Sequence, residues 1–185
     1  MRLFVGIAAD HLPLPEDTFK KLKINLSRLE FKLVPKTNLH ITLNFLGEIS
    51  EDLLPQIQKE LSELCTNHEA FELKLSDLDA FPEIRKGRNI WIGVQNSIAL
   101  RNLQSECEQR IRKLGITLEE REFKPHMTVA RTRNHQNLKD PLSPYHGHKF
   151  GILKVDSVVL YESVLGGAFP VYKKLWDCAL SYSAR

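Results

Sequence analysis

Two short segments of the sequence carry the same pattern of histidine and threonine. They are His40-Ile41-Thr42-Leu43 and His126-Met127-Thr128-Val129, and each lies in a run typical of a β-strand. In residues 38–45 polar and apolar side chains alternate without a break, and successive side chains of a strand point to opposite faces. The histidine and threonine of each motif are therefore predicted to share a polar face. The same alternation predicts that Asn44 faces outward and that Phe45 is buried.

A pair of histidines can supply an acid and a base near neutral pH. The unperturbed histidine pKa is about 6.5, so near neutral pH one imidazole can accept a proton while the other donates one. Displacement at phosphorus needs both roles, because the incoming oxygen loses a proton and the departing oxygen gains one on the opposite side. We therefore predict that His40 and His126 are catalytic residues that face each other across a groove.

The threonines and a nearby arginine could bind the phosphate. A hydroxyl two residues from each histidine, on the same strand face, can donate a hydrogen bond to a non-bridging oxygen, although β-propensity alone would also account for Thr42 and Thr128. Arg131 is preferred to Lys36 as the cation because a guanidinium can hold two phosphate oxygens. Simple alternation places Arg131 on the face opposite His126, so this role requires the strand to end, twist or bulge near Ala130.

The elements around the motifs follow an order that suggests a duplicated unit. A helix precedes each motif strand, and no linker or low-complexity segment divides the chain, so residues 1–185 are predicted to form one bilobal domain with a pseudo-two-fold groove. The polar segment 132–149, rich in proline and histidine, is predicted to be a long loop. The predicted strands are residues 2–9, 38–46, 71–75, 90–94, 125–131, 151–163 and 171–180, and the predicted helices are 17–33, 52–64 and 97–114, the last ending at Gly115.

The composition is that of a soluble globular protein. The chain has 185 residues, of which 42% are hydrophobic and 26% charged, with a formal net charge of +3. Its apolar runs are far shorter than the roughly 20 residues needed to cross a bilayer, and the first residues do not resemble a signal peptide. Three widely spaced cysteines favour buried thiols in a reducing compartment. We expect a cytoplasmic monomer without a membrane partner.

Other residues that could bind metal or nucleic acid are interpreted as structural. His135, His146 and His148 lie in the predicted loop without the cysteines or closely spaced carboxylates that would complete a metal site. The basic cluster at residues 85–88 is most simply a solvated hairpin tip, and Trp91 lies in an apolar run typical of a core strand. We predict neither a metal nor a cofactor.

The motifs and their flanks resemble a known family. The sequence is similar to the two-histidine (2H) phosphoesterase superfamily, which is defined by two His-x-Thr-x motifs, and more narrowly to the RNA 2′,3′-cyclic phosphodiesterases, historically called 2′-5′ RNA ligases. The resemblance extends along the chain in the expected order. It rests on residues 1–7 (MRLFVGI), 38–48 (NLHITLNFLGE), 123–131 (FKPHMTVAR) and 160–163 (LYES).

The resemblance implies a fold, a reaction and roles for the residues. The implied fold is α+β, with two antiparallel sheets lining a central groove and helices packed outside. The implied reaction is metal-independent hydrolysis of a 2′,3′-cyclic phosphate on RNA or a nucleotide to a 2′-phosphate, with reversible 2′-5′ ligation possible at the same site. His40 would protonate the departing 3′ oxygen and His126 would activate water, while Thr42, Thr128 and Arg131 would hold the phosphate.

Two alternatives remain open from the sequence. One is a non-catalytic module that binds RNA or nucleotides in the same groove. The other is a cyclic phosphodiesterase that acts on ADP-ribose cyclic phosphate or on small cyclic nucleotides.

Overall fold

In the part of the chain that the structure describes, nine antiparallel strands form one continuous sheet with two halves. The computed structural model describes residues 1–12, 14, 16–167 and 169–182. Among these residues the strands run in the order β7-β4-β5-β6-β3-β1-β8-β9, with β2 beside β6. Their bounds are β1 (Arg2–Ala8), β2 (Phe31–Leu33), β3 (His40–Glu48), β4 (Phe71–Phe81), β5 (Gly87–Val94), β6 (His126–Gln136), β7 (Lys149–Val155), β8 (Ser157–Val164) and β9 (Val171–Ala179).

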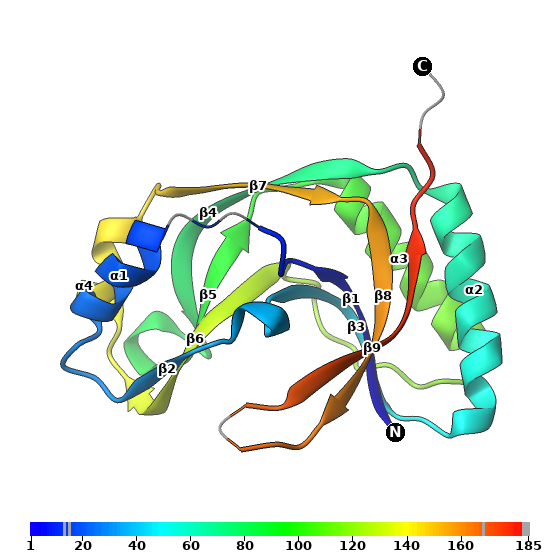
Figure 1. Cartoon of the computed structure of the whole chain (residues 1–185), viewed down its shortest axis with the longest axis horizontal. Helices are drawn as coiled ribbons and strands as arrows, with labels where there is room; N and C mark the ends of the chain where they lie inside the picture. The colour runs from blue at the N-terminus through cyan, green and yellow to red at the C-terminus, as the bar shows by residue number, and fades with distance from the viewer. Residues whose placement is uncertain (13, 15, 168, 183–185) are drawn as a thin grey trace.

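The two halves meet at the motif strands. Strand β3 pairs with β6 through Ile41 and Met127, and these two residues are the ones that follow the motif histidines. One half contains β7, β4, β5, β6 and β2, and the other contains β3, β1, β8 and β9 (Figure 1). The α+β fold predicted above is confirmed. The two antiparallel sheets that the resemblance implies are two halves of one sheet, joined by this single pair of residues.

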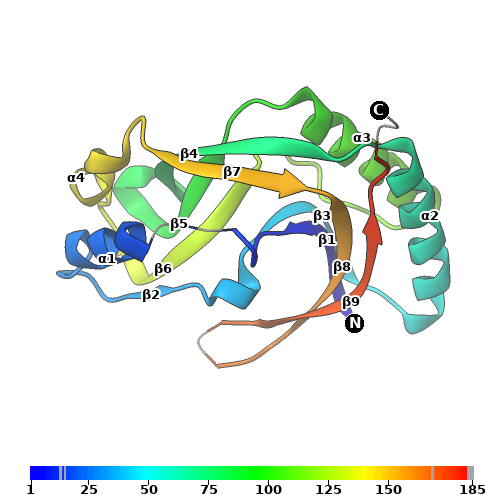
Figure 2. The same cartoon turned by 45° about the horizontal axis from the view of Figure 1, so that its top comes forward.

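The helices lie at the two ends of the molecule. Both views show α2 (Leu54–Asn67) and α3 (Ile98–Lys113) beside the half that contains β3, whereas α1 (Glu16–Asn25) and α4 (Lys139–Leu142) lie together at the opposite end (Figures 1 and 2). Short 3-10 helices occupy Lys36–Asn38, Glu51–Leu53, Ile84–Lys86 and Ser143–Tyr145.

Local sequence signals explain the bounds of α3 well. The Ser97 hydroxyl accepts a hydrogen bond from the Leu100 amide at the first turn, at 3.2 Å. Gly115 follows the helix with φ of 78°, a conformation that costs glycine little. The apolar residues on one face of α3 are buried, and the helix lies in contact with α2.

Most predicted elements differ from the structure by a few residues at their ends, and the largest differences concern three segments. The predicted helix 17–33 ends at Asn25, and Phe31–Leu33 is instead an edge strand beside β6, because the alternating Phe31 and Leu33 find a partner there that local sequence does not reveal. The predicted strand 151–163 is two strands separated at Asp156, where the chain crosses from one half of the sheet to the other.

The segment 132–149 is also more ordered than a long loop. Strand β6 continues to Gln136, which pairs with Gly87, and α4 and a 3-10 helix follow it. The polar side chains lie on an exposed part of the sheet, where polarity does not oppose strand pairing. Within the described ranges, no helix is long and apolar enough to cross a membrane.

Candidate active site

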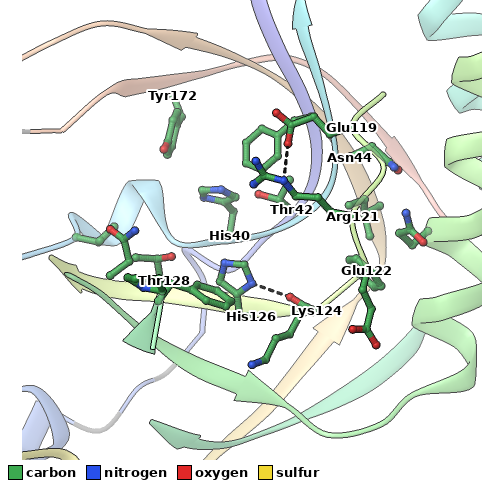
Figure 3. Close-up of a pocket in the computed structure, with 18 of the residues that line it drawn as sticks. His40, Thr42, Asn44, Glu119, Arg121, Glu122, Lys124, His126, Thr128 and Tyr172 are labelled. Carbon is green, nitrogen blue, oxygen red and sulfur yellow. Dashed lines mark hydrogen bonds and ion pairs between the residues drawn. The ribbon is translucent and has the colours of Figure 1, made fainter. Parts of the chain in front are cut away.

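Both motif histidines face a cavity between the two halves of the sheet. The cavity has a volume of about 930 Å³ and is lined by residues from β3 and β6, by the segment before β6 and by the β8–β9 hairpin. His40 and His126 lie at the junction of the halves, because the residues that follow them pair with each other. Figure 3 shows the two imidazoles near each other, each projecting from its own motif strand. The structure thus brings together the two histidines predicted from sequence.

A β-bulge in β6 places Arg131 on the same face as His126. Thr128 lies opposite Trp91 of β5, and Ala130 lies opposite the adjacent Ile90. Val129 is therefore an additional residue on β6 without a partner on β5. Val129 and Ala130 are consequently both buried, and Arg131 returns to the cavity. The bulge is the irregularity that the predicted role of Arg131 requires.

Strand β3 contains the same irregularity at the equivalent position. Asn44 lies opposite Val5 of β1, and Thr42 lies opposite the adjacent Gly6. Leu43 is therefore the additional residue on β3. Asn44 is therefore buried, whereas Phe45 is 60% exposed and lines the cavity. The prediction for these two side chains from strict alternation was wrong, because a bulge reverses the faces of the residues that directly follow it.

Each histidine is oriented by a backbone carbonyl two residues before it. His40 Nδ1 lies 2.7 Å from the Asn38 oxygen, and His126 Nδ1 lies 2.7 Å from the Lys124 oxygen. A carbonyl oxygen only accepts, so each Nδ1 carries the proton and donates it. The other nitrogen, Nε2, is thereby left in both rings to exchange protons with a substrate.

Burial in aromatic surroundings makes both histidines harder to protonate. His40 contacts the rings of Phe4, Tyr161 and Tyr172, and burial lowers its pKa to about 4 against the opposing effect of the Asn38 carbonyl. The positive charge of Arg131, and that of His126 whenever its imidazole is protonated, lower the pKa of His40 further.

His126 lies in similar surroundings. It contacts the rings of Phe81 and Trp91, and burial is again the main reason that its pKa is lowered. The Lys124 carbonyl opposes this shift, and the Lys124 charge adds to it. In the free protein at neutral pH, both imidazoles are accordingly neutral.

The predicted phosphate-binding residues lie around the same cavity. Thr42 and Thr128 line it from the two motif strands, and the Arg131 guanidinium lies over the Phe169 ring at 5.7 Å. The buried Nε of Arg131 has no hydrogen-bond partner within the part of the chain that the structure describes. A buried donor without a partner is costly, and an anion in the cavity would supply the missing acceptor.

The cavity includes residues that the sequence reasoning did not identify. Phe169 and Tyr172 reach it from the β8–β9 hairpin, and the Asn38 amide donates to the Pro170 oxygen at 2.9 Å, which ties the hairpin to the residue that orients His40. Arg121 and Lys124 reach it from the segment before β6 (Figure 3). Their positions depend on long-range packing. The only local sign was the short distance of Lys124 from the second motif.

The remaining histidines of segment 132–149 have separate surroundings. His148 packs against Tyr145 and Phe150, and the His146 imidazole lies 3.9 Å from the Asp77 carboxylate. His135 lines the cavity at a distance along β6 from His126. Within the described ranges, no three or more His, Cys, Asp or Glu side chains are grouped as metal ligands would be.

Comparison with known proteins places the chain in a family. The family model described as the 2′-5′ RNA ligase superfamily matches residues 13–166. The chain belongs to this superfamily. It is 34% identical over 180 residues to an RNA 2′,3′-cyclic phosphodiesterase of Archaeoglobus fulgidus, covering 95% of this chain and 98% of that protein. A protein of the same name from Methanocaldococcus jannaschii is 34% identical over 179 residues, covering 94% and 97%.

Solved structures have the same fold. The protein TT0787 of Thermus thermophilus has a TM-score of 0.78 and 25% identity, covering 99% of this chain and 100% of that one. Escherichia coli LigT complexed with 3′-AMP has a TM-score of 0.67 and 24% identity, covering 97% and 98%. The fold of this chain is therefore shared with both of these proteins.

Proposed function

We propose that this protein hydrolyses 2′,3′-cyclic phosphate ends of RNA to 2′-phosphate ends by paired histidine catalysis. The observation that carries the proposal is the arrangement of His40 and His126, whose Nε2 atoms are both left free to face one cavity from opposite halves of the sheet. The curated relatives of this chain are named for that reaction, and their similarity extends over nearly its whole length.

Binding of the phosphate prepares the pair for catalysis. Arg131 donates hydrogen bonds from Nε and its terminal nitrogens to the non-bridging oxygens of the phosphate. The hydroxyls of Thr42 and Thr128 donate one hydrogen bond each to the same oxygens. The negative charge of the phosphodiester raises the pKa of a neighbouring imidazole, which opposes the effect of burial. One histidine thus becomes protonated when the substrate binds, and the other remains neutral.

The difference between the halves supports an assignment of roles. Phe45 offers an apolar surface to the cavity from β3, while Arg131 offers a cation from β6, so the nucleoside lies against β3 and the phosphate oxygens face β6. The departing 3′ oxygen is part of the ribose and therefore lies near His40, which gives it a proton. His126 takes a proton from water as the water oxygen bonds to phosphorus and the bond from phosphorus to the 3′ oxygen breaks.

The same positions allow a ligation. A 5′-hydroxyl of another strand can take the place of water, and its attack on the cyclic phosphate forms a 2′-5′ linkage as the 3′ oxygen leaves. Abundant water favours hydrolysis. The steps use only protons exchanged with the two imidazoles, so we infer that turnover requires no metal.

Turnover of a 2′,3′-cyclic-ended oligonucleotide in the presence of a chelator tests the proposal. The wild-type protein should release a 2′-phosphate end, and His40→Ala and His126→Ala should each lower kcat by about 10²–10⁴-fold, the usual contribution of a general acid or base. His135→Ala is a matched control, because His135 lines the same cavity but has no place in the reaction. Full turnover by either motif variant would disprove the mechanism.

The same assay separates the proposed enzyme from the alternatives. Tight binding of the cyclic end without product would indicate a binding module. Higher kcat/KM for ADP-ribose cyclic phosphate than for the RNA end in competition would indicate the other substrate class.

A further inference from the structure

Three buried side-chain polar atoms lack a hydrogen-bond partner within the described part of the chain, and the reaction above gives a role to only one of them, Arg131 Nε. They are Arg131 Nε, Trp91 Nε1 and Asn44 Oδ1. The phosphate accounts for the Arg131 donor, and Trp91 packs against His126. Asn44 is only 8% exposed and lines the same cavity. A buried acceptor without a partner is costly, so its position beside a cavity indicates a ligand that donates a hydrogen bond.

Asn44 lies in a side branch of the cavity next to the reacting groups. Strands β3 and β6 pair only at Ile41 and Met127, so beyond this point β3 faces the segment 118–123 across an open gap whose floor is α3. Figure 3 shows Asn44 on the same side of the cavity as Glu119, Arg121 and Glu122, with Thr42 between it and the two histidines. The branch is therefore contiguous with the phosphate position.

Most other polar groups of the branch either form hydrogen bonds or ion pairs with each other or are hydrogen-bond acceptors. On its floor the Gln104 amide donates to Glu108 at 3.1 Å, and Arg112 pairs with Glu108 at 2.9 Å. At its rim Arg121 pairs with Glu119 at 3.0 Å. Apart from the amide nitrogen of Asn44, the branch consequently presents acceptors to an incoming group, namely Asn44 Oδ1 and the carboxylates of its rim, and this favours a ligand that carries several N–H donors.

We propose that this side branch binds the base of the nucleotide that bears the cyclic phosphate, and that it selects bases with an exocyclic amino group. This inference rests on the function proposed above. Cytosine, adenine and guanine each carry an exocyclic amino group that can donate hydrogen bonds to Asn44 Oδ1 and to a carboxylate. Asparagine and acidic side chains accept hydrogen bonds from the amino groups of bases in nucleic-acid complexes. Uracil presents a single ring N–H between two carbonyl oxygens, so it offers fewer N–H donors, and its oxygens would face the acceptors of the branch without a hydrogen bond.

The first measurement is kcat/KM of the wild-type protein for the four 2′,3′-cyclic mononucleotides. The cytosine, adenine and guanine substrates should exceed the uracil substrate by about 10-fold, within the range that a good hydrogen-bonded base contact provides. Equal values for all four would overturn the inference and leave the cyclic phosphodiesterase function intact. Failure to hydrolyse any of them or a cyclic-ended oligonucleotide would instead contradict the proposed function.

The second measurement uses Asn44→Leu, which removes the polar atoms at similar volume. The preference over uracil should fall to within about 2-fold, and the melting temperature should stay the same or rise, because a buried acceptor without a partner is removed. Asn89→Leu is the matched control, since Asn89 lines the opposite side of the cavity on β5, and it should keep the preference. A lower melting temperature with an unchanged preference would assign Asn44 a structural role and overturn the proposal.

Discussion

The two halves of the active-site groove have the same backbone arrangement around the histidine but place different side chains in the cavity. In both halves a bulge follows the threonine, and a carbonyl two residues before the histidine fixes its Nδ1. The residue five positions after the histidine, which the bulge turns into the cavity, is Phe45 in one half and Arg131 in the other. The shared features prepare two equivalent imidazoles. The difference gives the substrate a direction and thereby separates an acid from a base.

The carbonyls that orient the histidines are also held in different ways. Asn38 is buried, and its amide is bonded to the Pro170 oxygen of the β8–β9 hairpin. Lys124 instead places its ammonium group over the rings of Phe81 and Trp91, at 5.3 and 4.9 Å from their centroids. Both arrangements restrict the backbone near a histidine, one through a neutral hydrogen bond and the other through a cation–π contact. The charge of Lys124 additionally lowers the pKa of His126.

The sharpest test of this comparison replaces the leaving group. In 3′-deoxycytidine 2′-(4-nitrophenyl phosphate), 4-nitrophenolate leaves without needing a proton. His40→Ala should then regain most of the roughly 10²–10⁴-fold loss that it suffers on a cyclic phosphate, while His126→Ala should not. Initial rates of nitrophenolate release from both variants provide the measurement. Recovery by His126→Ala in place of His40→Ala would reverse the roles of the two halves.

The arginine position should give the next largest effect. Arg131→Ala removes the cation that stabilises the charged oxygens, and we expect kcat/KM for the cyclic end to fall by about 10²–10³-fold. Arg131→Lys should recover only part of this loss, because an ammonium group cannot hold two oxygens in the same planar geometry. Steady-state kinetics of both variants test the prediction, and Arg133→Ala is a nearby control on the exposed part of β6, where Arg133 pairs with Glu30. Equal activity of the Lys variant and the wild type would show that charge alone suffices.

The smallest expected effect is on the pH dependence of stability. The pKa of His40 is about 4 in the folded protein, so the unfolded chain, with a pKa near 6.5, binds a proton more readily between these values. Stability should therefore decrease as the pH falls from about 6.5 to about 4, by about 3 kcal/mol from this residue. Chemical denaturation across this range measures the slope, and His40→Gln should flatten it. An unchanged slope in that variant would mean that His40 is protonated in the folded protein.

Prediction from sequence succeeded where a local pattern was sufficient. The repeated His-x-Thr spacing predicted two strands with a shared polar face, and Gly115 predicted where α3 ends. It failed where a residue's environment depends on a partner strand. Phe31–Leu33 became a strand because β6 was available to pair with it, and the exposure of Phe45 depends on a bulge defined by its register with β1.

The amino-acid sequence by itself determined which chemical groups are present and which of them share a strand face, because side-chain direction follows from the twofold period of a strand. It also specified the family, since the two motifs and their flanks are contiguous in the chain. Only the tertiary structure decided that the histidines face one cavity, that Arg131 joins them and that Asn44 is left with a buried acceptor. Those outcomes depend on strand register, bulges and burial, which are set by contacts between residues far apart in the chain.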